Sequence, residues 1–400
     1  MAFVEELLGA SGPRLGGLGL LVIQPSPFCN IDCDYCYLPD RRSTKRMPVS
    51  VLRQALEKVC ASGLVGERLS IVWHAGEPLA LPVSYFEEAF AAIEALRLPA
   101  ERVEHSMQSN GMLVNDEWCS FIKRHNIRMG LSIDGPAFIH DAHRRTRAGR
   151  GTHAQVMRGA GALRRAGIDF HAIAVITEQS LDHPDEVFNF FVENGISRVG
   201  FNIDELEGAN RSSTLSGADA ERRVGDFFRR VFELQKRAGG AVRVREFDRA
   251  FQSIAQEGGD AAGRNDQVTP FAIVSVAHDG SLSTFSPELL GMPSRAYGDF
   301  SFGNVTRDGL ADAARTEKFG RVLADIRAGV RLCSEGCDYF SLCGGGAPSN
   351  KYYENGTFAS AETMYCRCTV KTPIDIVLAD LEASLGVRAE ASAGARAAGD

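Results

Sequence analysis

The chain has 400 residues, of which 44% are apolar and 24% charged, and its formal charge is −7. This is an ordinary globular composition, long enough for one large domain and a smaller one. Lys and Arg form no dense run, so the sequence predicts neither a nucleic-acid partner nor a membrane partner, both of which need concentrated positive charge. The apolar run at 15–23 is too short to span a bilayer and lacks a basic leader and a cleavage site. We therefore interpret it as a buried strand and expect a cytoplasmic protein.

Strand-like and helix-like segments alternate from residue 18 to about 240. The expected strands are 18–24, 69–75, 103–109, 127–134, 170–177 and 198–204, and the helices between them include 49–61, 83–96, 116–125 and 153–166. Six successive strand–helix units predict a parallel sheet with right-handed crossovers.

Polar motifs follow these strands directly. A cysteine group follows the first strand; the later motifs, in chain order, are Gly76-Glu77-Pro78, Ser109-Asn110, Ser132 with Asp134, Thr177, and Asp204-Glu205. In βα barrels the rim formed by the carboxyl ends of the strands is where active sites are built. Six motifs at one rim favour an α/β fold of the partial (β/α)6 barrel type over a doubly wound sheet.

The sequence pattern changes after about residue 265. Residues 271–287 predict two short strands around an Asp-Gly turn, and a cysteine- and glycine-rich segment follows to about 370. Residues 389–400 contain almost no large apolar side chain, so we expect them to be disordered. The expected organisation is a barrel at 1–265, a cysteine-bearing domain at 266–372, and a C-terminal helix with a disordered tail at 373–400.

Cysteine spacing points to metal chemistry. Ten cysteines in a chain without an export signal indicate metal or redox use rather than disulfides. Cys29, Cys33 and Cys36 are close together, and no fourth cysteine follows for more than twenty residues. Three thiolates on a 4Fe–4S cluster leave one iron open, and an open position marks catalytic rather than structural use. A zinc knuckle is the alternative, but its nearest downstream fourth ligand, His74, lies on another strand.

The segment CNIDCDYC at 29–36 resembles the C-x3-C-x2-C signature of the radical SAM superfamily, and the resemblance covers roughly residues 18–370. It implies that S-adenosylmethionine (SAM) binds the open iron and is cleaved to a 5′-deoxyadenosyl radical. It also implies cofactor contacts. Glu77, within a GGEP-like motif whose first Gly is Ala75, faces the methionyl amino group, and Arg144 faces the carboxylate. The other implied contacts are Tyr35 against adenine, Gly76 and Pro78 beside Glu77, Ser109 and Asn110 near the ribose, Ser132 with Arg144, and Asp134 at the same rim.

The second cysteine group resembles the SPASM (twitch-like) iron–sulfur extension of radical SAM peptide maturases. The full pattern has seven cysteines for two auxiliary clusters, whereas this chain keeps the four for one cluster: Cys333, Cys337, Cys343 and Cys366. Ala347 stands where the other cluster would take a ligand. The resemblance therefore implies a single auxiliary 4Fe–4S cluster. Zinc at these four cysteines is the structural alternative, and Cys368 is an alternative ligand to Cys366.

Three further segments, 202–208, 286–291 and 343–366, resemble cyclophane-forming maturases of the GrrM type. The resemblance implies that a β-carbon radical of a ribosomally made precursor peptide adds to a nearby aromatic ring. One electron must then leave, to the auxiliary cluster, and one proton, to a carboxylate. We favour Glu205 as the base, followed by Asp204, Glu207 and Glu288. A flavodoxin or ferredoxin would supply the electron that cleaves SAM.

Other functions stay open. The chain is also compatible with a maturase that makes thioether links or oxidises Ser or Cys to formylglycine. A non-catalytic iron–sulfur or zinc scaffold is the alternative from another class.

Overall fold

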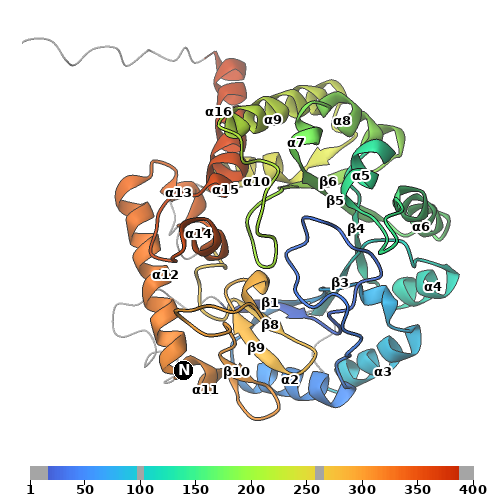
Figure 1. Cartoon of the computed structure of the whole chain (residues 1–400), viewed down its shortest axis with the longest axis vertical. Helices are drawn as coiled ribbons and strands as arrows, with labels where there is room; N and C mark the ends of the chain where they lie inside the picture. The colour runs from blue at the N-terminus through green and yellow to red at the C-terminus, as the bar shows by residue number, and fades with distance from the viewer. Residues whose placement is uncertain (1–16, 97–102, 257–264, 387–400) are drawn as a thin grey trace, which may run out of the picture.

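The computed structural model describes residues 17–96, 103–256 and 265–386. Its centre is one ten-stranded sheet in which six parallel strands follow each other in chain order (Figure 1). These are β1 (Leu18–Ile23), β2 (Val65–Trp73), β3 (Val103–Ser109), β4 (Arg128–Ser132), β5 (Phe170–Ile176) and β6 (Arg198–Ile203). The predicted α/β fold of the partial barrel type is confirmed.

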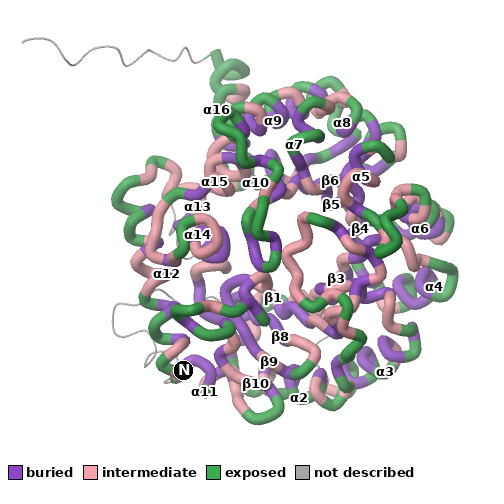
Figure 2. Tube along the Cα trace, in the orientation of Figure 1, coloured by how far each residue is buried: buried purple, intermediate pink, exposed green. Residues whose placement is uncertain are grey.

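Helices surround these strands. They are α2 (Val49–Ala61), α3 (Val83–Glu94), α4 (Asp116–Arg124), α5 (Ala137–His143), α6 (His153–Arg165), α7 (Glu178–Leu181), α8 (Pro184–Glu193) and α9 (Ala220–Arg237). Local signals explain their ends. In α4, for example, the Asn115 side chain accepts a hydrogen bond from the Trp118 amide, and basic residues occupy the last turn. Buried residues concentrate on the strands and on the helix faces turned toward them (Figure 2).

The sheet continues on both sides of the six strands. Beyond β6 lies the short β7 (Arg243–Val244), followed by α10 (Arg245–Ala255). On the other side β8 (Ile273–Val276) pairs in parallel with β1 and antiparallel with β9 (Ser281–Thr284), and β10 (Gly303–Asn304) follows. The predicted hairpin is therefore present. The hairpin belongs to the same sheet as the barrel strands. The expected boundary at 265 therefore marks a change in sequence pattern, but the sheet continues across it.

The rest of the extension is helical: α11 (Leu310–Ala314), α12 (Glu317–Gly336), α13 (Phe340–Cys343), α14 (Pro348–Asn355), α15 (Met364–Cys366), a π-helical turn (Arg367–Lys371) and α16 (Thr372–Leu385). The whole extension begins with β8 beside β1 and ends with α16 packed on α9 and α10. It therefore bridges the two sides of the open barrel (Figure 1). Within the described ranges, no helix is long and apolar enough to cross a bilayer. The predicted disordered tail at 389–400 lies outside the described residues.

Candidate functional site

The loop between β1 and α2 holds the first cysteine group. Cys29 and Cys33 are buried and Cys36 is half-buried, and all three belong to one small cluster. Burial raises the pKa of the Cys29 and Cys33 thiols to about 11 and about 12. Thiols with such values become thiolates when a cationic metal centre compensates their charge. In the described part of the chain, no three potential ligands converge tightly enough for one metal ion. Three cysteines clustered on one loop are the donor set that a 4Fe–4S cluster with one open iron would need.

The Gly76-Glu77-Pro78 segment packs directly on the cysteine loop. The Glu77 amide donates to the Phe28 carbonyl at 2.7 Å. Gly76 has φ +58°, and a Cβ there would lie 2.3 Å from the Phe28 carbonyl oxygen, so only glycine permits this contact. Ala75 also has a left-handed backbone, with φ +73°.

Glu77 is the centre of a buried hydrogen-bond network. Its carboxylate accepts from Ser109 Oγ at 2.8 Å, the Asn110 amide at 2.7 Å and the Leu79 amide at 3.0 Å. Burial raises the pKa of Glu77 to about 7, against these hydrogen bonds. Asn110 Nδ2 lies 3.8 Å from Cys29 Sγ, which places the network beside the first cysteine. A buried carboxylate at this position suits a ligand ammonium group.

A second network lies beside Cys33. Arg144 donates to both oxygens of Asp134, at 2.9 and 3.0 Å, and the Tyr35 hydroxyl donates to the same carboxylate. The third guanidinium nitrogen, Nη1, points to Cys33 Sγ at 3.9 Å. Ser132 is farther along the rim and accepts from Gln108 Nε2 at 3.1 Å. Asp134 therefore orients Arg144 and Tyr35, while Nη1 is the part of Arg144 that faces the cysteines.

Three of the four proposed bases gather at the rim after β6. Burial, followed by the neighbouring carboxylates, raises the pKa values of Glu205 and Glu207 well above the ordinary range, and burial raises that of Glu288. Asp204 has a structural role: its carboxylate accepts hydrogen bonds from Asn210 Nδ2 and from the amide and hydroxyl of Thr214. Asp204 thus holds the loop, and the acidic cluster consists of Glu205, Glu207 and Glu288.

The second cysteine group surrounds a cavity of about 110 Å³. Four cysteines line it: Cys333 in α12, Cys337 directly after α12, Cys343 in α13 and Cys366 in α15. Cys368 is not in this lining; it is 1% exposed and belongs to the main hydrophobic core. The four residues that the sequence selects are therefore the four that the fold brings together, and they fit one auxiliary cluster.

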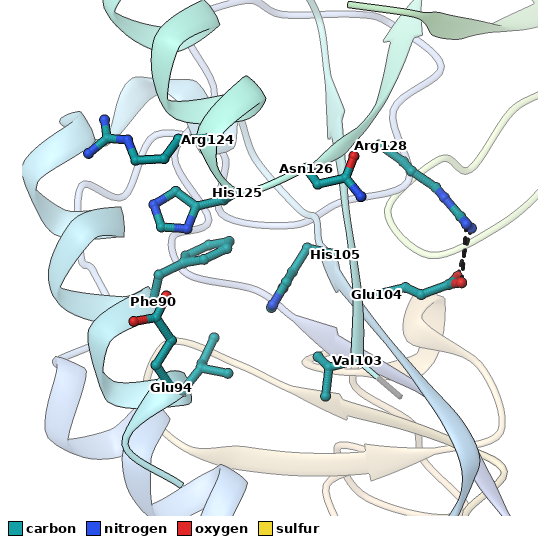
Figure 3. Close-up of a pocket in the computed structure, with 10 residues that line it drawn as sticks. Phe90, Glu94, Val103, Glu104, His105, Arg124, His125, Asn126 and Arg128 are labelled. Atoms are coloured by element: carbon teal, nitrogen blue, oxygen red, sulfur yellow. Dashed lines mark hydrogen bonds and ion pairs between the residues drawn. The ribbon is translucent and has the colours of Figure 1, made fainter. Parts of the chain in front are cut away.

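A larger cavity, of about 480 Å³, lies elsewhere (Figure 3). It is lined by the first residues of β3 and β4, including His105 and the Arg128–Glu104 ion pair. These are amino ends of barrel strands, so the cavity is at the opposite edge from the cysteine loop. Its size does not mark the reaction site.

Several side chains at the rim were not predicted. Tyr37 lies close enough to Glu288 and Glu207 for their charge to raise its pKa, after burial, and its hydroxyl is 3.5 Å from His74 Nδ1. Asn350 donates to Glu205, and Lys351 contacts Cys333. Tyr37 was detectable from its position next to Cys36. No sequence signal connects the other contacts, which join segments far apart in the chain.

Comparison with known proteins gives the class first. Residues 23–191 match the model of the Radical SAM superfamily. An uncharacterized protein of Synechocystis, sll1766, is 44% identical over 96% of this chain and 97% of its own length. The chain belongs to the radical SAM superfamily. Its cofactors are accordingly a 4Fe–4S cluster and SAM, as the cysteine loop predicted.

Named relatives and solved structures extend this result. A serine-type anaerobic sulfatase-maturating enzyme of Bacteroides thetaiotaomicron is 25% identical over 84% of this chain and 83% of its own length. The structure of anSMEcpe with bound AdoMet and the Cp18Cys peptide has a TM-score of 0.73 at 21% identity, covering 92% of this chain and 99% of that one. Streptococcus suis SuiB bound to precursor peptide SuiA has a TM-score of 0.65 at 17% identity, covering 91% and 78%. These structures share the fold, including the extension.

Proposed function

We propose that this chain oxidises the β-carbon of one residue in a peptide or protein substrate. One observation carries the proposal: adjacent residues of α14 contact the two groups that such an oxidation requires. Asn350 donates to Glu205 of the acidic cluster, and Lys351 Nζ lies 3.2 Å from Cys333 Sγ of the four-cysteine cavity. The carboxylate that would accept the proton and the cavity that would hold the electron acceptor therefore both contact α14, at the rim that carries the cysteine loop.

SAM, bound with the cluster at Cys29, Cys33 and Cys36, supplies the group that removes a hydrogen atom from the substrate. The substrate radical must then lose one electron and one proton to become a closed-shell product. Glu205 and Glu207 suit the proton transfer, because a carboxylate with a raised pKa is a stronger base. The cavity lined by Cys333, Cys337, Cys343 and Cys366 would hold the electron acceptor. A flavodoxin- or ferredoxin-like donor would supply the electron for SAM cleavage.

Formylglycine formation is the best supported product class. Relatives that align over more than four fifths of this chain are named serine-type and cysteine-type anaerobic sulfatase-maturating enzymes. With a serine substrate, loss of a β-hydrogen atom, an electron and the hydroxyl proton turns the alcohol into an aldehyde. The comparisons thus favour this chemistry over the cyclophane that we first expected from the sequence.

Cyclophane formation is the second candidate. The described part of the chain brings together four cysteines at one cavity, and Ala347 lines that cavity where the two-cluster pattern has a cysteine. This reduced set, with the resemblance of 202–208 and 286–291 to GrrM-type enzymes, supports ring closure between a β-carbon and an aromatic carbon. The electron and proton requirements are the same as for aldehyde formation.

The test is anaerobic co-expression with candidate substrate peptides, including any small peptide found to be encoded beside this gene, followed by mass spectrometry. Formylglycine from serine and a cyclophane each remove two hydrogens, so mass alone does not separate them. A hydrazide probe labels the aldehyde only, whereas suppressed fragmentation between two residues marks the ring. A β-deuterated substrate should pass deuterium to 5′-deoxyadenosine in both cases. Deuterium from the α-carbon, with a thioether product, would overturn β-carbon oxidation.

A further inference from the structure

Lys351 is a buried cation at the four-cysteine cavity. The residue is 3% exposed, and its Nζ donates to the Gly329 carbonyl at 3.0 Å and to Cys333 Sγ at 3.2 Å. It lies on α14, and it lines the cavity together with the four cysteines. The sequence motifs assign it no role.

The surrounding backbone is shaped for this side chain. A Cβ at Gly329 would lie 2.1 Å from the Phe358 carbonyl oxygen and 3.3 Å from Lys351 Nζ. Glycine at this position of α12 therefore lets the loop at Phe358 and the lysine approach the helix closely. A Cβ at Gly346 would lie 3.7 Å from Lys351 Cε, so the stem of the lysine runs along the glycine segment after Cys343.

Among the described residues, no carboxylate forms an ion pair with the Lys351 ammonium group. Neither of its two hydrogen-bond acceptors is a carboxylate: one is a carbonyl oxygen and the other a sulfur. A lysine is almost never fully buried unless it is paired with an anion. Four thiolates around an iron–sulfur cluster provide that anion, because their negative charge exceeds the positive charge of the metal–sulfide core.

We propose that Lys351 raises the reduction potential of the auxiliary cluster and so makes it an electron acceptor. Accepting one electron adds one negative charge beside the ammonium group, and attraction to that group favours the reduced state. The electron comes from the substrate radical, whose proton goes to the acidic cluster. The direction of this electron transfer rests on the proposed function, whereas the effect of Lys351 on the potential does not.

Lys371 provides a matched control. It lines the same cavity, but its ammonium group is ion-paired with Glu362 and lies 5.2 Å from the centre of the Tyr339 ring. Its side chain is 24% exposed, so water and the carboxylate already compensate its charge. Removing the Lys371 charge should therefore change the electrostatic potential in the cavity much less than removing the Lys351 charge.

The experiment is an EPR-monitored redox titration in the Cys29→Ala/Cys33→Ala/Cys36→Ala background, in which only the auxiliary cluster remains. Lys351→Met removes charge and hydrogen bond, Lys351→Gln keeps a donor without the charge, and Lys351→Arg keeps the charge. We expect a more negative midpoint potential for Lys351→Met and Lys351→Gln, and a value near that of the background for Lys371→Met and Lys351→Arg.

The remaining outcomes are also decisive. An unchanged potential in Lys351→Gln would overturn the proposal, as would an equal shift in Lys371→Met or tightly bound zinc in place of iron. If Lys351→Met and Lys351→Gln lose their iron but Lys351→Arg keeps it, the charge retains the cluster, and the proposal that it sets the potential would be overturned. Loss of iron in all three variants would show that lysine shape, not charge, matters, and would also overturn the proposal. A shifted potential, together with no β-carbon oxidation by the protein that keeps Cys29, Cys33 and Cys36, would instead contradict the proposed function alone.

Discussion

Asn350 Nδ2 donates a hydrogen bond to Glu205 Oε2, and this contact joins α14 of the extension to the loop after β6 of the barrel. The loop that follows β6 reaches toward α14 across the mouth of the barrel (Figure 1). Because burial and the neighbouring Glu288 raise the pKa of Glu205, this hydrogen bond fixes in place a carboxylate that is suited to take a proton.

Replacing Glu205 by glutamine should separate hydrogen abstraction from product formation. We expect Glu205→Gln to lower product formation by about 10²-fold or more, the usual contribution of a general base. Formation of 5′-deoxyadenosine should continue, because hydrogen abstraction precedes proton loss. Both products can be quantified in one anaerobic assay. Glu221→Gln, at a half-exposed surface pair with Arg367, is the control and should leave both unchanged. Equal rates in the two variants would remove Glu205 from the mechanism.

The acidic cluster should also make stability depend on pH. The pKa values of Glu205, Glu207 and Glu288 are higher in the folded protein than in the unfolded chain. At any pH between the unfolded and the folded pKa, these groups therefore bind more protons in the native protein. The contribution of this cluster to the free energy of unfolding must then fall as pH rises above about 4.5 and level off once the cluster is ionised. Urea denaturation at pH 5, 6.5 and 8 should show a smaller decline in Glu207→Gln than in the wild type. A parallel decline in both proteins would contradict this account.

Iron content tests the ligands of the auxiliary cluster. The wild-type protein should hold about eight irons, for two 4Fe–4S clusters. Cys366→Ala should reduce this number to about four, because Cys366 lines the cavity with the other three cysteines. Cys368→Ala is the matched control, two positions away in the hydrophobic core, and should keep about eight. The reverse result would identify Cys368 as the ligand, and a wild-type value near twelve would reveal a further cluster.

Backbone strain before Glu77 gives a prediction about stability. Ala75 has a left-handed backbone, which costs a non-glycine residue about 1–2 kcal/mol. Ala75→Gly relieves this strain but adds unfolded-state entropy, so we expect a net gain of about 0.5–1 kcal/mol in the free energy of unfolding. Gly76→Ala should be strongly destabilising, because its Cβ would lie 2.3 Å from the Phe28 carbonyl oxygen. Chemical denaturation measures both variants. A destabilised Ala75→Gly protein would show that the alanine methyl makes a necessary contact.

Local sequence patterns were sufficient for the barrel and for both cysteine groups, because strand and helix periodicity and ligand spacing are short-range properties. The start of β2 was placed four residues late, since the exposed Glu67 and Arg68 interrupt its apolar pattern. The contacts of Asn350 with Glu205 and of Lys351 with Cys333 were not predicted. They depend on how the extension packs on the barrel, and neither partner carries a motif that reports the other.

The pairing of β1 with β8 has a consequence for biosynthesis. Leu20 and Ile273 are partners in the sheet, although nearly the whole barrel is synthesised between them. Until β8 has left the ribosome, the strand that leads into Cys29 has one uncovered edge, and such edges invite pairing with other chains. The catalytic cysteine loop is thus the earliest part of the active site to be translated, and its strand is completed only when the C-terminal third of the protein arrives.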